Sequence, residues 1–311
     1  MLQVVVRRVL MAVPVVVGVS AIIFFTLRAL PGDPVLLITQ NDPGLTKHQL
    51  YELEKSLGLT KPILVQYWQF VVHALQGNLG TSYQTKQPVL EMIRQQALPT
   101  VELAAAASFL TTVMGIAGGV LAAIYRDKWV DSFLRIFSLL GASMPIFWTG
   151  PLLLLLFSFT LHWFPSDGSG SFKQLVLPAF SLALAGAGLV VRLVRNSMLE
   201  VMSNEFVSAL RAKGVSEGRI LLRHILRNAL IPAVTVLALQ VGGLLAGTVL
   251  TETIFGRQGI GNLLAQSVLN KDYPVIQACV LIFGTVYVVL NIVVDISYAY
   301  LDPRVRTAMT R

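Results

Sequence analysis

Residues that could carry catalytic chemistry are few in this sequence and are scattered along it. The four histidines, His48, His73, His162 and His224, do not form a metal-binding spacing. No G-x-x-x-x-G-K-[ST] phosphate loop, His-Glu-x-x-His motif or Gly-x-Ser-x-Gly turn occurs. The single cysteine, Cys279, lies in an apolar run and is expected to be buried and unreactive. We therefore predict no catalytic residue, no metal site and no enzymatic activity.

Three acidic residues near the ends of long apolar stretches are the remaining ionisable candidates for a functional site. Glu102, Glu252 and Asp295 are costly in a bilayer and could line a path for a substrate. Alternatively, they pair locally or extend toward the membrane surface, with Arg192 or Arg195 as the candidate partner of Asp295. The sequence leaves both roles open.

The composition indicates a membrane protein. The chain has 311 residues, of which 55% are hydrophobic and 13% are charged, and its mean hydropathy is +0.70. Soluble domains carry about 25% charged residues, so this chain lacks the polar surface of a cytosolic enzyme, a disordered protein or a nucleic-acid-binding domain. The net charge of +8 is instead typical of Lys and Arg held on the cytoplasmic side of a membrane.

Six charge-free apolar stretches are long enough to cross a bilayer, whose hydrocarbon core requires about 20 residues. They are expected to be helical, because lipid offers no partners for backbone N–H and C=O groups. Prolines inside several of them suggest kinked helices around a cavity. The stretches are Val9–Leu27, Leu103–Ile124, Ile136–Leu161, Gln174–Val191, Asn228–Thr251 and Tyr273–Val294.

The distribution of basic residues predicts that both termini lie in the cytoplasm. With the N-terminus inside, fifteen of the 24 Lys and Arg residues fall in predicted cytoplasmic segments. The first stretch follows Arg7 and Arg8 and could be mistaken for a signal peptide. It is long for that role, and no small-residue cleavage site follows it, so we expect it to be retained as a membrane span.

Small residues at helical spacing predict close helix packing. Gly115 and Gly119 form a Gly-x-x-x-Gly pair in the second stretch, and Gly243 and Gly247 form another in the fifth. Packing within the chain is one role for these pairs, and a sliding contact with a partner is the other.

Two long loops separate the stretches. The first, from Pro31 to about Pro99, is predicted to lie outside, with a helix starting at a Thr46–Gln49 capping box and a second helix from Pro62 to about Leu75. It is either a small extracytoplasmic cap that contacts a delivery protein or substrate, or an amphipathic segment resting on the membrane.

The second loop, Arg192 to Arg227, is predicted to lie inside. Phe206, Ala209 and Leu210 mark a short amphipathic helix that stops at Lys213-Gly214, where glycine supplies a left-handed turn. Ser216 is expected to cap a second helix that is apolar on one face and basic on the other. This helix pair either lies against anionic lipid headgroups or fits a cleft in a cytoplasmic partner.

The second loop resembles the "EAA" coupling loop of ABC-importer permeases, and most closely the dipeptide/oligopeptide/nickel branch of that family. The similarity rests on Glu205-Phe-Val-Ser-Ala-Leu-Arg-Ala-Lys-Gly214 and Arg223-His-Ile-Leu-Arg-Asn-Ala-Leu-Ile-Pro232, although Ser208, Ala209 and Leu210 stand where the general pattern has Glu-Ala-Ala. Further matches in the order of the branch are Pro31-Gly-Asp-Pro34, Gly58-Leu-Thr-Lys-Pro62, Gln66-Tyr67, Gly77-Asn-Leu-Gly80 with Ser82, Glu252-Thr-Ile-Phe255, Gly259-Ile-Gly261, Asp272-Tyr-Pro-Val-Ile276, Asp295 with Tyr298, and Leu301-Asp-Pro-Arg304.

The resemblance implies an all-α membrane protein with six transmembrane helices, the type I ABC-importer fold, and a helical extracytoplasmic segment between helices 1 and 2. It divides the chain into an N-terminal transmembrane helix (1–30), the extracytoplasmic segment (31–98), a transmembrane core (99–299) containing the coupling loop (203–223), and a cytoplasmic tail (300–311). The implied location is a bacterial or archaeal cytoplasmic membrane, which the chain crosses several times.

The resemblance also implies partners. These are a second, homologous permease, two cytoplasmic ATPase subunits that hold ATP and Mg²⁺, an extracytoplasmic substrate-binding protein and membrane lipid, with no nucleic acid. This chain itself binds no cofactor. The residues implied to couple it to the ATPases are Glu205, Phe206, Ala209, Lys213, Gly214, His224, Asn228 and Pro232.

The expected function is import of di- or oligopeptides by alternating access, driven by ATP hydrolysis on the partner chains. The same architecture importing nickel chelates or glutathione is the nearest alternative. A proton- or sodium-driven transporter would require acidic residues near the midplane and inverted repeats, whereas the acidic residues here lie near the ends of the stretches and no such repeat is evident. A structural membrane subunit is a third possibility, which the kinked stretches and two elaborate loops disfavour.

Overall fold

The computed structural model describes residues 2–29, 47–56, 58 and 60–301, and every structural statement below concerns these residues. The Pro31-Gly-Asp-Pro34 turn, the Thr46 cap and the end of the terminal motif after Leu301 lie outside the described residues.

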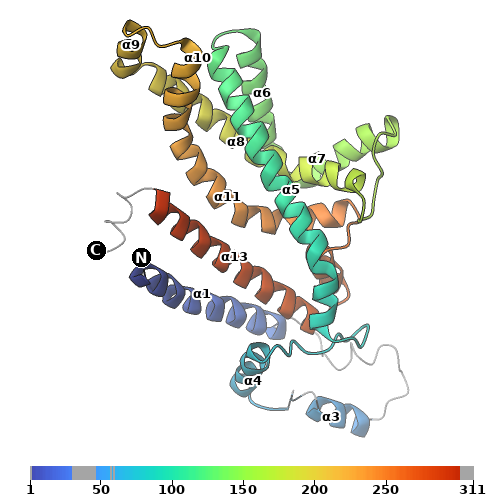
Figure 1. Cartoon of the computed structure of the whole chain (residues 1–311). Helices are drawn as coiled ribbons and strands as arrows, with labels where there is room; N and C mark the ends of the chain where they lie inside the picture. Colours follow the sequence, from blue (N-terminus) through green and yellow to red (C-terminus); the bar gives the residue numbers. More distant parts are fainter. Residues whose placement is uncertain (1, 30–46, 57, 59, 302–311) are drawn as a thin grey trace. The chain divides into compact units, whose positions relative to one another are not determined.

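The described part of the chain is helical (Figure 1), apart from one isolated β-bridge between Thr81 and Pro88. Two segments, η1 and η2, are π-helical. The elements are α1 (Leu2–Ala29), α3 (Lys47–Ser56), α4 (Ile63–Leu75), α5 (Val89–Ile124), α6 (Trp129–Ser143), α7 (Ile146–Leu153), η1 (Leu154–Thr160), α8 (Phe172–Met202), α9 (Glu205–Ala212), α10 (Glu217–Arg219), η2 (Ile220–Ile225), α11 (Leu226–Ile254), α12 (Ile260–Leu269) and α13 (Tyr273–Leu301).

Five described segments are long and apolar enough to cross a membrane, in agreement with five of the six predicted stretches. They are Val6–Ala29, Val89–Ile124, Phe172–Met202, Glu217–Ile254 and Tyr273–Ile296. The count reaches six if a bent pair of helices forms one span.

The third predicted stretch, Ile136–Leu161, is not one continuous helix. It is divided between α6 and α7–η1, which meet at a bend of 115°. The break falls at Met144 and Pro145, whose ψ angles of 123° and 144° are extended. Proline disfavours the helical conformation in the residue before it, so the sequence contained the cause of the break although the apolar pattern runs through it.

The chain divides into two compact units. Unit 1 comprises Met1–Leu98 and Gln258–Arg311, and unit 2 comprises Pro99–Arg257. In unit 1, residues 258–301 group with the N-terminal part because α13 packs along α1 and α12 packs along α13.

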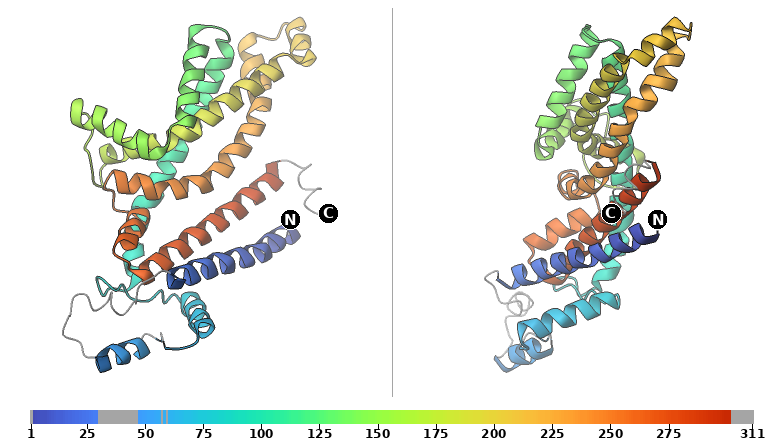
Figure 2. Two further views of the ribbon diagram at one scale, coloured as in Figure 1. Left: turned by 180° about the vertical axis from the view of Figure 1, so that it is seen from behind. Right: turned by 90° about the vertical axis from the view of Figure 1, so that its left-hand side faces the viewer.

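In unit 1, α1 and α13 lie side by side and antiparallel (Figures 1 and 2). Arg8 near the start of α1 pairs with Asp295 near the end of α13, with 2.9 Å between Nη1 and Oδ2. Leu27 packs with Tyr273 and Ile276 at the other end of the pair. The expectation that Asp295 pairs with Arg192 or Arg195 is therefore wrong. Since a long-range ion pair leaves no periodic signal in the sequence, only the fold identifies Arg8.

The predicted helix from Pro62 to about Leu75 is confirmed as α4, which packs against α1. The ring of Phe24 contacts those of Tyr67 and Phe70, at centroid distances of 5.4 and 5.7 Å. The hydroxyls of Tyr67 and Ser20 are 2.9 Å apart and hydrogen-bonded. Several other apolar side chains of α4 are exposed, including Leu64, Trp68 and Leu75.

A buried carboxylate in unit 1 joins two of the short motifs singled out in the sequence. Asp272 accepts hydrogen bonds from the Ser82 hydroxyl and, at 3.0 Å, from the backbone N–H of Tyr83. Ser82 and Asp272 are both almost fully buried. The carboxylate thus fixes the turn before α5 to the start of α13.

Replacement of Asp272 by Ala is expected to lower the free energy of unfolding by about 2 kcal/mol, since hydrogen bonds to a charged group contribute about 1.5–3 kcal/mol. Thermal denaturation in detergent measures the loss, and limited proteolysis should detect opening of the turn at 77–88. Gln84→Ala is the control, because Gln84 lies in the same turn but its amide is exposed. Equal midpoints for the two variants would contradict the prediction.

Unit 2 is organised around α8, which packs against α6 and α11 (Figures 1 and 2). Glycines permit the close approach of the helices. A Cβ at Gly188 would collide with the carbonyl of Ser138 in α6, and one at Gly141 would lie 2.7 Å from the carbonyl of Leu184. These two glycines do not form a Gly-x-x-x-Gly pair, and the sequence analysis missed them.

The four glycines of the predicted packing pairs differ in their surroundings. A Cβ on Gly115 or Gly119 would lie about 2.5–2.6 Å from side-chain atoms of Val190 or Val194. A Cβ on Gly247 would lie 2.5 Å from Leu182, whereas a Cβ on Gly243 would meet nothing within 4 Å. Gly243 is therefore not a close-packing position within the described chain.

Candidate coupling site

The segment Ser203–Arg223, here called the α9 loop, is anchored to unit 2 by a few apolar side chains. Val207 of α9 and Ile220 of η2 are fully buried. They pack in one cluster with Val194 and Met198 of α8. The end of α8 therefore holds the α9 loop as a folded knob. The sequence pattern named Phe206, Ala209 and Leu210 as the residues that mark this amphipathic helix and missed Val207.

The outer face of α9 carries exposed residues, which we call the α9 stripe: Phe206, Ala209 and Lys213. Their spacing of three and four residues places them along one side of the helix, and all three are exposed, Phe206 by 40%. Glu205, at the first position of α9, is also exposed. The stripe combines an aromatic ring, a small residue that permits close approach and a positive charge.

The turn after α9 has the predicted left-handed glycine. Gly214 has a φ of +76°. Its N–H donates to the Arg211 carbonyl at 2.9 Å, and the N–H of Val215 donates to the Leu210 carbonyl at 3.2 Å. This pair of bonds is the Schellman arrangement that ends helices at glycine. The prediction that α9 stops at Lys213-Gly214 is confirmed.

An ion pair spans this turn. Arg211 donates from Nε to Glu217 Oε1 at 2.7 Å and from Nη2 to Oε2 at 3.3 Å. The hydrogen bond to Glu217 raises the pKa of Arg211. Both side chains are exposed, so the pair contributes little stability. Ser216 stands at the N-cap of α10 as expected, but its hydroxyl makes no capping bond.

The predicted second helix begins as one turn of α-helix and continues as the π-helix η2 before joining α11. Ile220 and Ile225 are buried, whereas Arg219, Arg223 and Arg227 are exposed, which confirms the predicted apolar and basic faces. The wider π turn was not predicted from the sequence, and such turns occur frequently at functional sites.

The remaining coupling candidates lie in η2 (His224) and in the first two turns of α11 (Asn228 and Pro232). The side-chain amide of Asn228 donates to the His224 carbonyl at 2.9 Å. Pro232 lies inside α11 and is exposed. His224, Asn228 and Pro232 thus lie on the connection from the α9 loop to α11, while Glu205, Phe206, Ala209, Lys213 and Gly214 belong to the loop itself.

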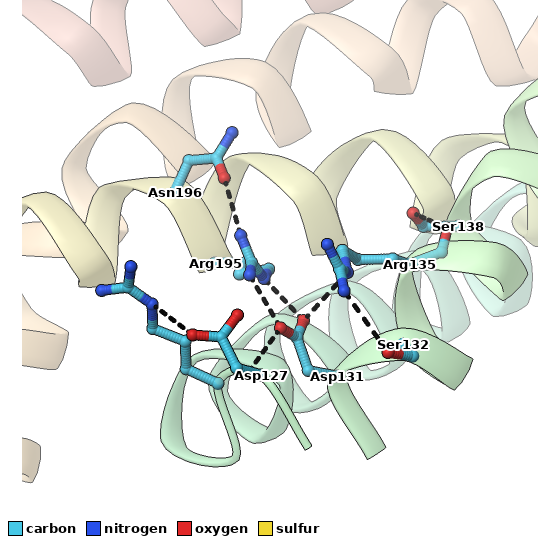
Figure 3. A network of polar contacts seen from close by, with 8 residues as sticks. Asp127, Asp131, Ser132, Arg135, Ser138, Arg195 and Asn196 are labelled. Carbon is cyan, nitrogen blue, oxygen red and sulfur yellow. Dashed lines mark hydrogen bonds and ion pairs between the residues drawn. The ribbon is translucent and has the colours of Figure 1, made fainter. Parts of the chain in front are cut away.

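A charge network that sequence reasoning missed ties α6 to α8 (Figure 3). Asp131 is fully buried, and its two carboxylate oxygens accept from Nε and Nη2 of Arg195 at 2.7 and 2.8 Å. It also accepts from the backbone N–H of Asp127, at 3.1 Å, in the turn before α6. Arg135 lies 3.5 Å from the same carboxylate. The turn between α5 and α6 lies at the same end of unit 2 as α9 (Figure 1).

The three acidic candidates for a substrate path are divided between the two units. Glu102 and Glu252 lie near Arg257 in unit 2, and Asp295 pairs with Arg8 in unit 1. Glu252 is buried and Glu102 is half-exposed. The distance from Glu102 Oε2 to Arg257 Nη2 is 3.9 Å. Burial lowers the pKa of Arg257, and the nearby glutamates partly offset that effect.

Comparison with known families covers nearly the whole chain. Residues 115–307 match the family described as "Binding-protein-dependent transport system inner membrane component". Residues 1–104 match the N-terminal model described as "Binding-prot-dependent transport system membrane comp, N-term".

Similar proteins and solved structures agree with this match. The glutathione transport system permease protein GsiC of Salmonella paratyphi A is 39% identical over 306 residues, which is 98% of this chain and 99% of that protein. GsiC of Escherichia coli strain K12 is 37% identical over the same shares.

Among solved structures, the inward-facing MetNI methionine ABC transporter aligns with a TM-score of 0.56 at 17% identity, covering 71% of this chain and 98% of that chain. An amino acid ABC transporter with histidines aligns with a TM-score of 0.54 at 13% identity, covering 68% and 94%. These likenesses show the type I ABC-importer permease fold. The chain is therefore a multi-pass inner-membrane permease, a non-enzymatic transport subunit, and belongs to the family of binding-protein-dependent transport system inner membrane components.

Proposed function

We propose that this permease imports di- and oligopeptides by alternating access, and that glutathione, a tripeptide, is one of its substrates. The 39% identity to a glutathione transport permease over nearly the full length supports this substrate class. Family membership favours ATP-driven import over a proton- or sodium-driven mechanism and over a purely structural role. Nickel chelates remain the alternative cargo.

The proposed partners are a second, homologous permease, two cytoplasmic ATPases that bind ATP and Mg²⁺, and an extracytoplasmic binding protein that delivers the substrate. We also propose that both termini of this chain lie in the cytoplasm. The antiparallel pairing of α1 and α13 supports having the start of one helix and the end of the other at the same membrane face.

The observation that carries this proposal is the construction of the α9 loop. Its inner face is fixed by Val207 and Ile220, while the α9 stripe of Phe206, Ala209 and Lys213 is exposed. A rigid knob with an exposed aromatic side chain is suited to a cleft in a partner, because buried aromatic anchors dominate binding energy. The ATPase subunits would grip this knob and move it as they bind and hydrolyse ATP.

The energy required is consistent with a docked loop. Inverting a two-state equilibrium from 1:99 to 99:1 takes about 5.5 kcal/mol of differential binding. An exposed surface ion pair such as Arg211–Glu217 contributes far less than this. The whole α9 stripe, engaged by an ATPase that opens and closes, is the larger contact that such a change requires.

Replacement of Gly214 by Pro is expected to leave the permease in the membrane but to uncouple ATP hydrolysis from uptake. Proline fixes φ near −65°, whereas Gly214 requires +76°, and proline also removes the N–H that donates to Arg211. The α9 stripe would then lose its orientation relative to η2. The measurement is ATPase activity and uptake of labelled tri-alanine and glutathione by the reconstituted complex of permeases, ATPases and binding protein.

The matched control places proline two residues later, at Ser216. That residue is the N-cap of α10 and already has a φ of −63°, and this chain carries proline at two other N-caps, Pro62 and Pro145. We expect Ser216→Pro to retain uptake and coupling. Unchanged uptake in Gly214→Pro would refute the role of the turn, whereas failure of the wild-type complex to import either peptide would refute the proposed substrate class.

A further inference from the structure

Helix α4 of unit 1 carries an exposed apolar stripe formed by Leu64, Trp68 and Leu75, here called the α4 stripe. An α-helix turns about 100° per residue, so these three residues lie within about 40° of one another around the axis. Their exposed fractions lie between 67% and 83%. The α4 stripe is thus an apolar surface that the rest of the described chain leaves uncovered.

The opposite face of α4 is polar. Gln66, Gln69 and His73 lie about 140–200° around the axis from Leu64. The helix contains no Asp, Glu, Lys or Arg. Separate apolar and polar faces are typical of helices that lie in the plane of a membrane surface, with tryptophan on the apolar side.

The side of α4 between these two faces packs against α1, and its contacts define how α4 is turned. Gln66, on the polar face, accepts at Oε1 from Nε of Arg28 at 2.9 Å. The hydroxyls of Tyr67 and Ser20 are 2.9 Å apart, and the Val17 carbonyl lies 3.3 Å from the Tyr67 hydroxyl. The polar face of α4 therefore meets the end of α1, whereas Tyr67, beside the apolar stripe, meets α1 nearer its middle.

These contacts place α4 within the thickness of the membrane. The span contributed by α1 ends at Ala29. Phe24, whose ring contacts those of Tyr67 and Phe70 at 5.4 and 5.7 Å, lies about 8 Å inside that end at a rise of 1.5 Å per residue. Interfacial helices are buried about 5–10 Å into the boundary between headgroups and acyl chains, so the level of α4 along α1 is the level of such a helix.

The hydrogen bonds of α4 agree with a site that excludes water. The Tyr67 hydroxyl has the Ser20 hydroxyl and the Val17 carbonyl as neighbours, and Ser20 is buried. The Gln66 amide donates to the Lys61 carbonyl at 2.8 Å, in addition to its bond from Arg28. Polar groups in lipid require partners within the protein, whereas a hydroxyl or an amide in water does not.

We propose that α4 is an interfacial helix seated in the outer leaflet of the membrane, with the α4 stripe against lipid acyl chains. The polar face then points toward the aqueous phase, on the same side as Arg28. The apolar surface continues onto α1, where Phe25 is 36% exposed and its ring lies 5.6 Å from that of Tyr67. Trp68 belongs to a residue type enriched at membrane–water interfaces. The inference uses the proposed topology, in which α1 ends on the outer side, and is independent of the cargo.

Other occupants of this surface satisfy the observations less well. A soluble binding protein would have to enter the bilayer to reach side chains at the level of Phe24. A second permease could lie there, but a stable protein interface buries about 800 Å² on each partner, which is more than three side chains supply. Lipid covers a narrow apolar stripe without that requirement.

The test places a nitroxide spin label at each position of the α4 stripe, in the variants Leu64→Cys, Trp68→Cys and Leu75→Cys. Cys279, the single cysteine, is fully buried and is replaced by Ala so that each variant carries one label. The complete complex is reconstituted in phosphatidylcholine–phosphatidylglycerol bilayers, with and without the binding protein. Electron paramagnetic resonance then measures collisions of the label with dioxygen, which enters lipid, and with a polar nickel chelate, which stays in water.

We expect collisions with the chelate to be at least about tenfold rarer at the α4 stripe than at a water-exposed label, a factor that corresponds to about 1.4 kcal/mol of exclusion from lipid. Collisions with dioxygen should be as frequent as for a nitroxide on a lipid acyl chain in the same bilayer. The matched control is His73→Cys, an exposed position on the polar face of the same helix, where the chelate should collide freely. Gln84→Cys, in the exposed turn before α5, is a second reference for water.

Chelate collisions at the α4 stripe as frequent as those at His73→Cys would overturn the proposal in favour of an aqueous cap. Rare collisions with both reagents would overturn it in favour of a protein contact. That contact is with the binding protein if the protection disappears when this protein is omitted, and with the second permease if the protection remains. Peptide uptake is measured in parallel, and failure of the wild type to import peptides would refute the proposed function while leaving the lipid position of α4 standing.

Discussion

Replacement of Arg195 by Met should lower the free energy of unfolding by about 3–5 kcal/mol, the range measured when one partner of a buried ion pair is removed. The Asp131 carboxylate is fully buried and receives two hydrogen bonds from Arg195, at 2.7 and 2.8 Å. Without Arg195 it keeps the Asp127 N–H and the more distant, half-exposed Arg135. Thermal or chemical denaturation in detergent measures the loss.

Two further variants test whether the loss of stability comes from breaking a buried ion pair or from removing any positive charge. Arg211→Met also removes an arginine from an ion pair, but both partners there are exposed, so its effect on stability should be much smaller than that of Arg195→Met. The double variant Asp131→Asn with Arg195→Met leaves no uncompensated charge and should recover most of the lost stability. Similar losses in Arg195→Met and Arg211→Met would show that the buried network does not stabilise unit 2.

Replacement of Arg257 by Met is expected to lower the free energy of unfolding by about 3 kcal/mol, since a buried charged hydrogen-bonding network is left incomplete. Arg257 is only 1% exposed and donates to the carbonyl of Gln174 at 3.2 Å and to that of Pro99 at 3.4 Å. Pro178 has no N–H, so the Gln174 carbonyl four residues earlier lacks its helical donor. Arg257 supplies that donor, and its charge lies near Glu252.

The shape of the guanidinium is part of this prediction. Lysine keeps the positive charge but presents a single ammonium rather than a planar fork, so Arg257→Lys should recover only part of the stability. Lys173→Met is the control for loss of an exposed cation in the same unit and should change stability by less than about 0.5 kcal/mol. Full recovery with Lys would show that charge alone matters at this position.

Local features of the chain were predictable because their causes are local. The ending of α9 at Lys213-Gly214 follows from the conformational freedom of one glycine. Five spans follow from runs of apolar residues that must satisfy their backbone in lipid. The remaining stretch, Ile136–Leu161, was predicted as one helix because its apolar residues continue through the break that Pro145 imposes.

The contacts that organise the two units were not predictable in the same way. Asp131 and Arg195 lie on different helices, and so do Ser20 and Tyr67. Nothing in the spacing of these residues distinguishes them from other charged or polar residues. Likewise, Ser82 and Asp272 were singled out as parts of separate motifs, but their hydrogen bond joins positions 190 residues apart.

The sequence by itself determined that this protein lies in a membrane, that its spans are helical and where the α9 loop lies along the chain. It could do so because hydropathy and glycine conformation act over a few residues. The tertiary structure decided which charges are buried in pairs, which face of α9 is exposed, and at what level α4 lies along α1. Those properties depend on the helix that packs opposite each residue, and packing between distant segments leaves no periodic mark on the chain.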